Sequence, residues 1–145
     1  MPGGKTKELY PFICAIINID GEKLGSVEFL IDTGSGVTVI SAKDAMRIGI
    51  NQIKGKLISI TGIAGGEKCP QIRKDIDIIF IDSEDQTNIL AINTDKITYR
   101  LLPHKHRGKQ FQEQFRVPSL LGWDIMSKLK ITLDYANNTV ELCKQ

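Results

Sequence analysis

The sequence has little of several features that would assign a protein to a special class. No apolar run is long enough to cross a bilayer, and residues 1–5 lack the apolar stretch of a secretory signal peptide. The net charge of +2 is too small to indicate a nucleic-acid or membrane partner. We therefore expect a cytoplasmic protein that binds neither nucleic acid nor membranes.

Cysteine is also scarce. Cys14, Cys69 and Cys143 are an odd number with no short paired spacing, which favours reduced thiols over a disulfide framework or a zinc site. His104-Lys105-His106 offers two imidazoles, but no carboxylate or cysteine nearby completes a metal site. We predict no metal and no other cofactor, and we interpret residues 103–114 as a solvated basic loop.

What is present is typical of one compact domain. Hydrophobic residues make up 41% of the chain and charged residues 25%, which are ordinary values for a globular protein. A length of 145 residues is enough for a single core, and no internal repeat or low-complexity segment is evident. We predict one domain over residues 1–145.

Strands dominate the pattern. Apolar runs and alternations, bounded by turn residues, predict seven strands. They are expected at Phe12 to Asp20, Leu24 to Ile31, Leu57 to Ile63, Lys68 to Ile72, Ile76 to Ile81, Ile131 to Tyr135 and Thr139 to Cys143. Between residues 83 and 117 the sequence is harder to interpret, although a weak alternation over Thr87 to Leu102 is compatible with a further strand.

Helical signals are few and short. Ser41 is a good N-cap for a helix that runs to Met46 or Arg47, with Asp44 as a capping-box-like partner and Gly49 at its end. A second helix is expected from Asp124 to Leu129. So much strand with so little helix predicts an all-β fold, a closed barrel with two short helices.

The most informative segment is Asp32-Thr33-Gly34-Ser35. It follows the apolar run from Val27 to Ile31 and precedes a second one from Val37 to Ile40, so it places a carboxylate on a tight turn at a strand end. From these four residues alone, a catalytic turn and an ordinary solvated turn remain equally open.

A second segment, Leu120-Leu121-Gly122-Trp123-Asp124-Ile125-Met126, lies ninety residues further on. Together the two segments resemble the active-site turn and the apolar-apolar-Gly segment of the single-domain, retropepsin-like aspartic proteases, the retroviral-protease-like branch. In that family the second segment runs behind the turn, and Gly122 would be required by the close approach of two backbones. The resemblance extends from about Phe12 to Leu142 and implies a barrel of the acid-protease type.

The resemblance also implies a homodimer. The chain has one Asp-Thr-Gly turn, whereas the mechanism needs two carboxylates that share a proton and a water. The predicted catalytic residues are Asp32, Thr33, which would brace the two turns across the dimer axis, and Gly34. Ser35 and Gly36 are predicted to lie against the substrate.

A flap is the other expected feature of the family. The Gly-rich hairpin tip at residues 62–66 fits such a lid, and it predicts that Ile63, Ala64, Gly65 and Gly66 bind a polypeptide substrate. An ordinary Gly-Gly hairpin turn is the alternative.

Two positions depart from the retroviral pattern. Gly36 and Trp123 stand where retroviral members usually have Asp and Arg, which suggests that apolar contacts and terminal strands hold the dimer. For Trp123 we expect packing on the barrel rather than substrate contact. Ser35 is expected to donate to the outer oxygen of Asp32; the alternative is a bond to backbone within the turn.

The sequence therefore predicts a homodimeric aspartic endopeptidase without a cofactor. Its dyad would consist of Asp32 from each subunit. The alternative is a non-catalytic dimerisation or peptide-binding module that retains the fold.

Overall fold

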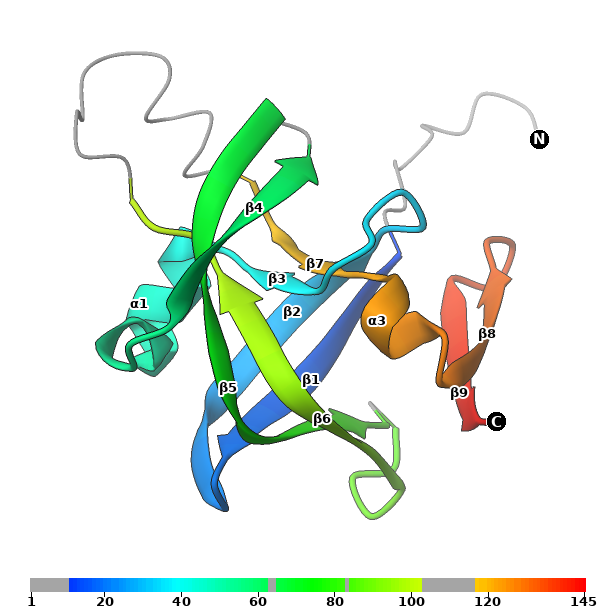
Figure 1. The fold of residues 1–145 in the computed structure, drawn as a ribbon. Helices are drawn as coiled ribbons and strands as arrows, with labels where there is room; N and C mark the ends of the chain where they lie inside the picture. Colours follow the sequence, from blue (N-terminus) through cyan, green and yellow to red (C-terminus); the bar gives the residue numbers. More distant parts are fainter. Residues whose placement is uncertain (1–10, 63–64, 83, 103–116) are drawn as a thin grey trace.

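The computed structural model describes residues 11–62, 65–82, 84–102 and 117–145 of the chain. Figure 1 shows a β-barrel with a small separate hairpin at the C-terminal side. The strands are β1 (Phe12–Ile19), β2 (Glu22–Ile31), β3 (Val39–Ile40), β4 (Lys56–Gly62), β5 (Gly65–Ile81), β6 (Ile89–Tyr99), β7 (Ser119–Leu121), β8 (Leu129–Asp134) and β9 (Thr139–Lys144). The helices are α1 (Ala42–Ile48), the 3-10 helix η1 (Ile50–Gln52) and α3 (Trp123–Met126).

Strand pairing closes the barrel. The order in the sheet is β1-β2-β7-β3-β6-β5-β4, and β1 also pairs with β5, so six strands of the described chain form a closed ring. Strand β4 pairs only with β5, and the hairpin that these two strands form extends from the ring. The predicted all-β closed barrel with two short helices and a protruding hairpin is confirmed. No helix in the described ranges is long and apolar enough to span a membrane.

The barrel interior is filled by the alternating apolar residues. In β2, Val27 and Phe29 are fully buried and Ile31 is nearly so, whereas Glu28 between them is exposed. Isoleucines from β1, β5 and β6 complete the same core. Because a fully buried side chain of this size contributes roughly 1.5–3 kcal/mol, this alternation fixes which face of β2 points inward.

Residues with positive φ form the turns of two hairpins. Between β1 and β2, Asp20 and Gly21 both have positive φ, 50° and 80°, as a two-residue hairpin loop requires. Asn138, with φ 54°, occupies the corresponding left-handed position between β8 and β9. Each of these turns joins two antiparallel strands that the sequence predicted.

The first helix begins as predicted and ends slightly later. The Ser41 side chain accepts a hydrogen bond from the Asp44 backbone N–H, and Gly49 ends the helix in a left-handed conformation. The reciprocal half of the capping box is absent. The Asp44 carboxylate instead accepts hydrogen bonds from Arg47 and from Ser119 on β7, so it ties the helix to the barrel.

Several boundaries were predicted wrongly. The two strands expected at Lys68 to Ile72 and Ile76 to Ile81 are one bent strand, β5, whose pairing with β6 shifts between Arg73 and Ile76. A bulge lets one strand turn a corner of the barrel without ending, and the charged bulge residues look like a loop in sequence. The second helix is shorter than expected because the chain re-enters a strand at Leu129.

The segment between residues 83 and 117, which was the hardest to interpret from sequence, contains a long strand. Residues 89–99 form β6, which pairs with β5 along most of its length and carries the buried residues Ile92, Ile97 and Tyr99. The weak alternation therefore did indicate a strand. The predicted basic loop at 103–114 lies outside the described residues.

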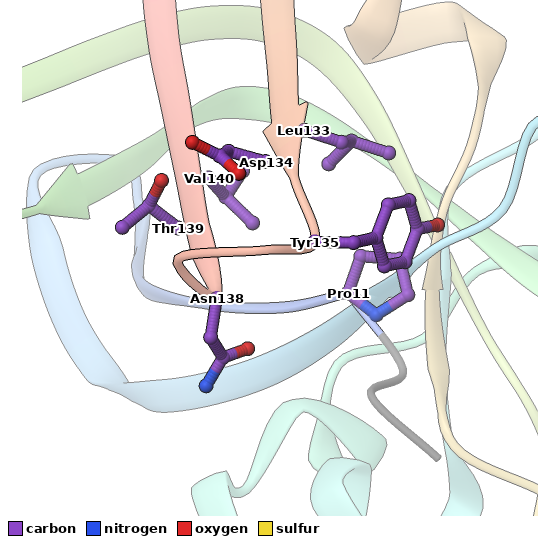
Figure 2. Close-up of a pocket in the computed structure, with 7 residues that line it drawn as sticks. All are labelled: Pro11, Leu133, Asp134, Tyr135, Asn138, Thr139 and Val140. Carbon is purple, nitrogen blue, oxygen red and sulfur yellow. The ribbon is translucent and has the colours of Figure 1, made fainter. Parts of the chain in front are cut away.

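The β8–β9 hairpin forms a sheet of its own beside the barrel (Figure 1). Ile131, Val140 and Leu142 pack one face of it against the core. Its tip, together with Pro11 from the start of the described chain, lines a shallow pocket (Figure 2). At that tip the Tyr135 ring remains exposed.

Candidate active site

Asp32 lies where β2 ends. Its backbone N–H donates to the Leu121 carbonyl on β7 at 3.1 Å, which extends the β2–β7 pairing by one residue. The Ser35 N–H then donates back to the Asp32 carbonyl, also at 3.1 Å, and closes a tight turn. Asp32 is half-buried, and Thr33 and Gly34 at the tip are exposed. The predicted carboxylate on a turn at a strand end is therefore present.

The turn fixes the carboxylate of its own first residue. The Gly34 N–H donates to Asp32 Oδ1 at 2.9 Å. A Cβ at position 34 would lie 3.2 Å from the same oxygen, closer than carbon normally approaches. A side chain there would push against the carboxylate, so this position favours glycine for reasons of space rather than backbone angle.

The segment behind the turn approaches as closely as its sequence indicates. A Cβ on Gly122 would lie 2.5 Å from the Val37 carbonyl carbon and 2.8 Å from the Thr38 nitrogen. Both neighbours are backbone atoms and cannot move aside. The predicted requirement for glycine at position 122 is confirmed.

The comparisons with known proteins agree with this geometry. Residues 15–125, well over half of the chain, match the sequence pattern of the family described as aspartyl protease. The chain belongs to the aspartyl protease family. No curated protein matches it. A solved structure of the EIAV protease complexed with the inhibitor HBY-793 is similar to it, with 16% identity, coverage of 86% of this chain and 91% of that chain, and a TM-score of 0.46.

In this aspartyl protease the turn is braced from behind by a buried polar network. Thr38, only 2% exposed, donates to Asp124 Oδ1 through its backbone N–H at 3.0 Å and its hydroxyl at 2.6 Å. The same hydroxyl accepts a hydrogen bond from the Gly122 N–H at 3.0 Å. Neither Thr38 nor Asp124 was predicted as a site residue. A threonine inside the apolar run 37–40 was the available signal, since a buried hydroxyl needs a partner.

Trp123 does not pack in the core, contrary to expectation. Its side chain is 55% exposed, and its indole Nε1–H donates to the Thr33 carbonyl at 2.7 Å. Its backbone N–H donates to the Ser35 carbonyl at 2.9 Å. Figure 1 shows α3 next to the loop between β2 and β3, in agreement with these contacts. The ring therefore lies against the Asp32 turn, because the close approach at Gly122 brings the next residue there.

The Ser35 hydroxyl binds backbone within the turn and not the Asp32 carboxylate, which was the expected partner. Its hydroxyl donates to the Val37 carbonyl at 2.7 Å. A serine hydroxyl has a single proton to donate, so the predicted bond to the Asp32 carboxylate is not made. Ser35 therefore shapes the turn.

The predicted flap is a β4–β5 hairpin that projects from the barrel (Figure 1). Gly65 and Gly66 belong to it, and Gly62 pairs with Gly65 at the last described position. Ile63 and Ala64, the other predicted flap residues, lie outside the described residues.

One arm of this hairpin is anchored by a partly buried ion pair that was not predicted from the sequence. Arg100, 6% exposed, donates from Nε to Glu67 Oε1 at 2.8 Å. Nearby, burial and then the charge of Glu67 raise the pKa of Cys69 to about 12. This thiol is fully buried, so it is an inert packing group. The part of the chain that the structure describes holds no group of three or more His, Cys, Asp or Glu side chains suited to a metal.

Proposed function

We propose that the protein is a homodimeric aspartic endopeptidase in which Asp32 of two subunits forms the catalytic dyad. The observation that carries the proposal is the intact Asp-Thr-Gly turn, closed by its own hydrogen bonds and exposed at its tip, in a chain of the aspartyl protease family. Two turns must face each other because each chain brings one such carboxylate.

The chemistry follows from a dyad that holds one proton. The ionised carboxylate takes a proton from a water, and the resulting hydroxide attacks the peptide carbonyl carbon. The protonated carboxylate donates its hydrogen bond to the carbonyl oxygen, which becomes the oxygen of a tetrahedral intermediate. Breakdown of this intermediate transfers a proton to the leaving amine and breaks the C–N bond.

The other predicted residues have supporting roles in this proposal. Thr33 is exposed at the tip of the turn, where its hydroxyl can reach the partner turn. The Gly34 carbonyl accepts no hydrogen bond from the described chain, so it is available to a substrate N–H. Gly36 has open space around it, which leaves room for a polypeptide. Ile63, Ala64, Gly65 and Gly66 would close over the bound peptide.

The decisive experiment is digestion of a complex peptide library by the wild type and by Asp32→Asn. We expect cleavage by the wild type and a loss of at least about a thousandfold in the variant. Circular dichroism and sedimentation should show that the variant keeps its fold and its assembly. Equal cleavage by both proteins would refute the dyad, and no cleavage by either would favour a peptide-binding module.

Dilution tests the dimer separately. Specific activity per chain should fall once the protein is diluted below the dimer dissociation constant, because half a dyad is inactive. An excess of Asp32→Asn chains should also inhibit the wild type by forming mixed dimers. Constant activity of a sedimenting monomer would exclude this assembly.

A further inference from the structure

We infer that Trp123 is a positioning residue for Asp32 and acts through the peptide group between Thr33 and Gly34. This inference rests on the proposed function, and its first test does not require activity. The indole Nε1–H donates to the carbonyl of this peptide group at 2.7 Å. The N–H of the same peptide group donates to Asp32 Oδ1 at 2.9 Å.

These two bonds connect the indole to the carboxylate through one planar unit. A peptide group is rigid, so a donor that fixes its carbonyl oxygen also fixes the direction of its N–H. A hydrogen bond to the carbonyl also polarises the group and makes its N–H a stronger donor. The indole therefore orients the Asp32 carboxylate and strengthens the hydrogen bond that it accepts.

The position of the indole is itself fixed by the chain. The Trp123 N–H binds the Ser35 carbonyl at 2.9 Å, and the Asp124 N–H binds the Gly36 carbonyl at 3.3 Å. Two backbone bonds thus hold α3 against the turn on the side where the indole reaches the tip. An exposed aromatic with a short, well-placed bond to the catalytic turn has a use beyond filling space.

Other charged groups could affect the carboxylate and must be controlled. On α3 the only titratable side chain is Asp124, whose Oδ1 is occupied by Thr38. β7 and β3 have none. β2 carries Glu22, Lys23 and Glu28, of which Glu28 is nearest in sequence and pairs with Cys14 of β1. In the proposed dimer the partner's Asp32 is the strongest neighbour.

The chain has a single tryptophan, so its indole gives one identifiable N–H resonance. We expect this resonance to titrate with Asp32 in the wild type and in Asp124→Asn, and to show no such inflection in Asp32→Asn. A wild-type resonance that does not titrate, or an inflection that persists in Asp32→Asn, would overturn the inference. These spectra can be recorded even if the protein cleaves no peptide.

Kinetics provide the second test. Replacement of the tryptophan by benzothienylalanine, which has sulfur in place of the N–H, removes the donor and keeps the ring shape; Trp123→Phe is the genetic equivalent. We expect kcat to fall about tenfold with KM nearly unchanged, the loss of roughly one hydrogen bond in the transition state. The acidic limb of kcat/KM should move to higher pH, because the ionised carboxylate is less favoured.

The matched control is Tyr135→Phe, which removes a donor from another exposed aromatic ring, at the tip of the β8–β9 hairpin. It should leave kcat and the acidic limb unchanged. All rates must be measured at increasing protein concentration. If the Trp123 variant recovers full kcat when the dimer is saturated, or matches the wild type throughout, the inference is wrong.

Discussion

The loop between β2 and β3 and the tip of the β8–β9 hairpin both present an aspartate on a tight turn, yet the two turns are held in opposite ways. Around Asp32, the bracing bonds come from residues 84 to 90 positions away in the sequence. Around Asp134, the carboxylate accepts bonds from the backbone and side chain of Asn137, three positions away. The first turn has distant partners in addition to its own hydrogen bonds, whereas the Asp134 carboxylate is bound by its own turn.

The two carboxylates also differ in how many of their oxygens are occupied. Asp134 has both carboxylate oxygens occupied by Asn137, and these bonds lower its pKa. Asp32 accepts one hydrogen bond from the described chain and keeps its second oxygen available. A carboxylate saturated by its own turn caps that turn, whereas one with spare acceptor capacity can bind a water or a second carboxyl group.

The largest contrast is expected between the reactivities of two cysteine thiols, one near each of these two regions. Cys69 packs beside Val39 just beyond the Asp32 turn, and Cys143 lies exposed on β9. Burial and the raised pKa of Cys69 leave little thiolate at neutral pH, so we expect iodoacetamide to modify it at least about a hundredfold more slowly than Cys143. Mass spectrometry of a time course measures both rates. Equal rates would mean that the barrel wall opens as readily as the hairpin.

Gly122→Ala should cause the largest loss of stability. The new Cβ would lie 2.5 Å from a backbone carbon and has no side chain to displace, so we expect a cost of about 3 kcal/mol. Chemical denaturation measures the free energy of unfolding. The control is Gly36→Ala, where the added Cβ meets nothing within 4 Å and stability should stay within about 0.5 kcal/mol. Similar losses for both variants would contradict the close approach behind the turn.

Thr38→Val should have the next largest effect. It removes the hydroxyl that binds Asp124 and Gly122 and leaves the buried Gly122 N–H unpaired, although the Thr38 backbone N–H still donates to Asp124, so we expect a cost of about 2 kcal/mol. The same change at the exposed Thr139 on β9 is the matched control and should be nearly neutral. If the two variants unfold at the same denaturant concentration, the network behind the turn contributes no net stability.

The smallest effect concerns the hairpin. Because Asp134 has a lower pKa in the folded protein than in the unfolded chain, its contribution to stability is present above the ordinary carboxyl pKa and is lost as pH falls through the folded value. In Asn137→Ala the pKa should rise toward the ordinary value. Carbon NMR of the carboxyl group measures this titration. An ordinary pKa already in the wild type would contradict the two bonds from Asn137.

Sequence patterns predicted the features that local chemistry determines. The two tight hairpins, the Ser41 cap and the inward face of β2 all depend on residues a few positions apart. The turn at Asp32 was predicted for the same reason. The family resemblance placed residues 120–126 behind that turn. The side-chain hydrogen bonds that brace it were not predicted, because no local pattern gives the geometry between residues ninety positions apart.

The errors have this common cause. Trp123 was expected to pack on the barrel because the helix that follows it must dock there, and only the approach of α3 to the turn places the indole at Thr33. The pair of Arg100 and Glu67 joins β5 to the end of β6, and each residue alone is an ordinary surface charge in sequence. Ser35 had two local partners in reach, and the sequence could not choose between them.

The place of β7 in the sheet has a consequence for synthesis of the chain. β7 lies between β2 and β3, and it pairs Phe29 with Ser119. At roughly 5–20 residues per second, a ribosome needs about 5–20 s after Asp32 to add the strand that holds the Asp32 turn. A nascent chain therefore carries this aspartate on an unsupported loop, and the turn takes its final shape only after β7 and α3 have left the ribosome.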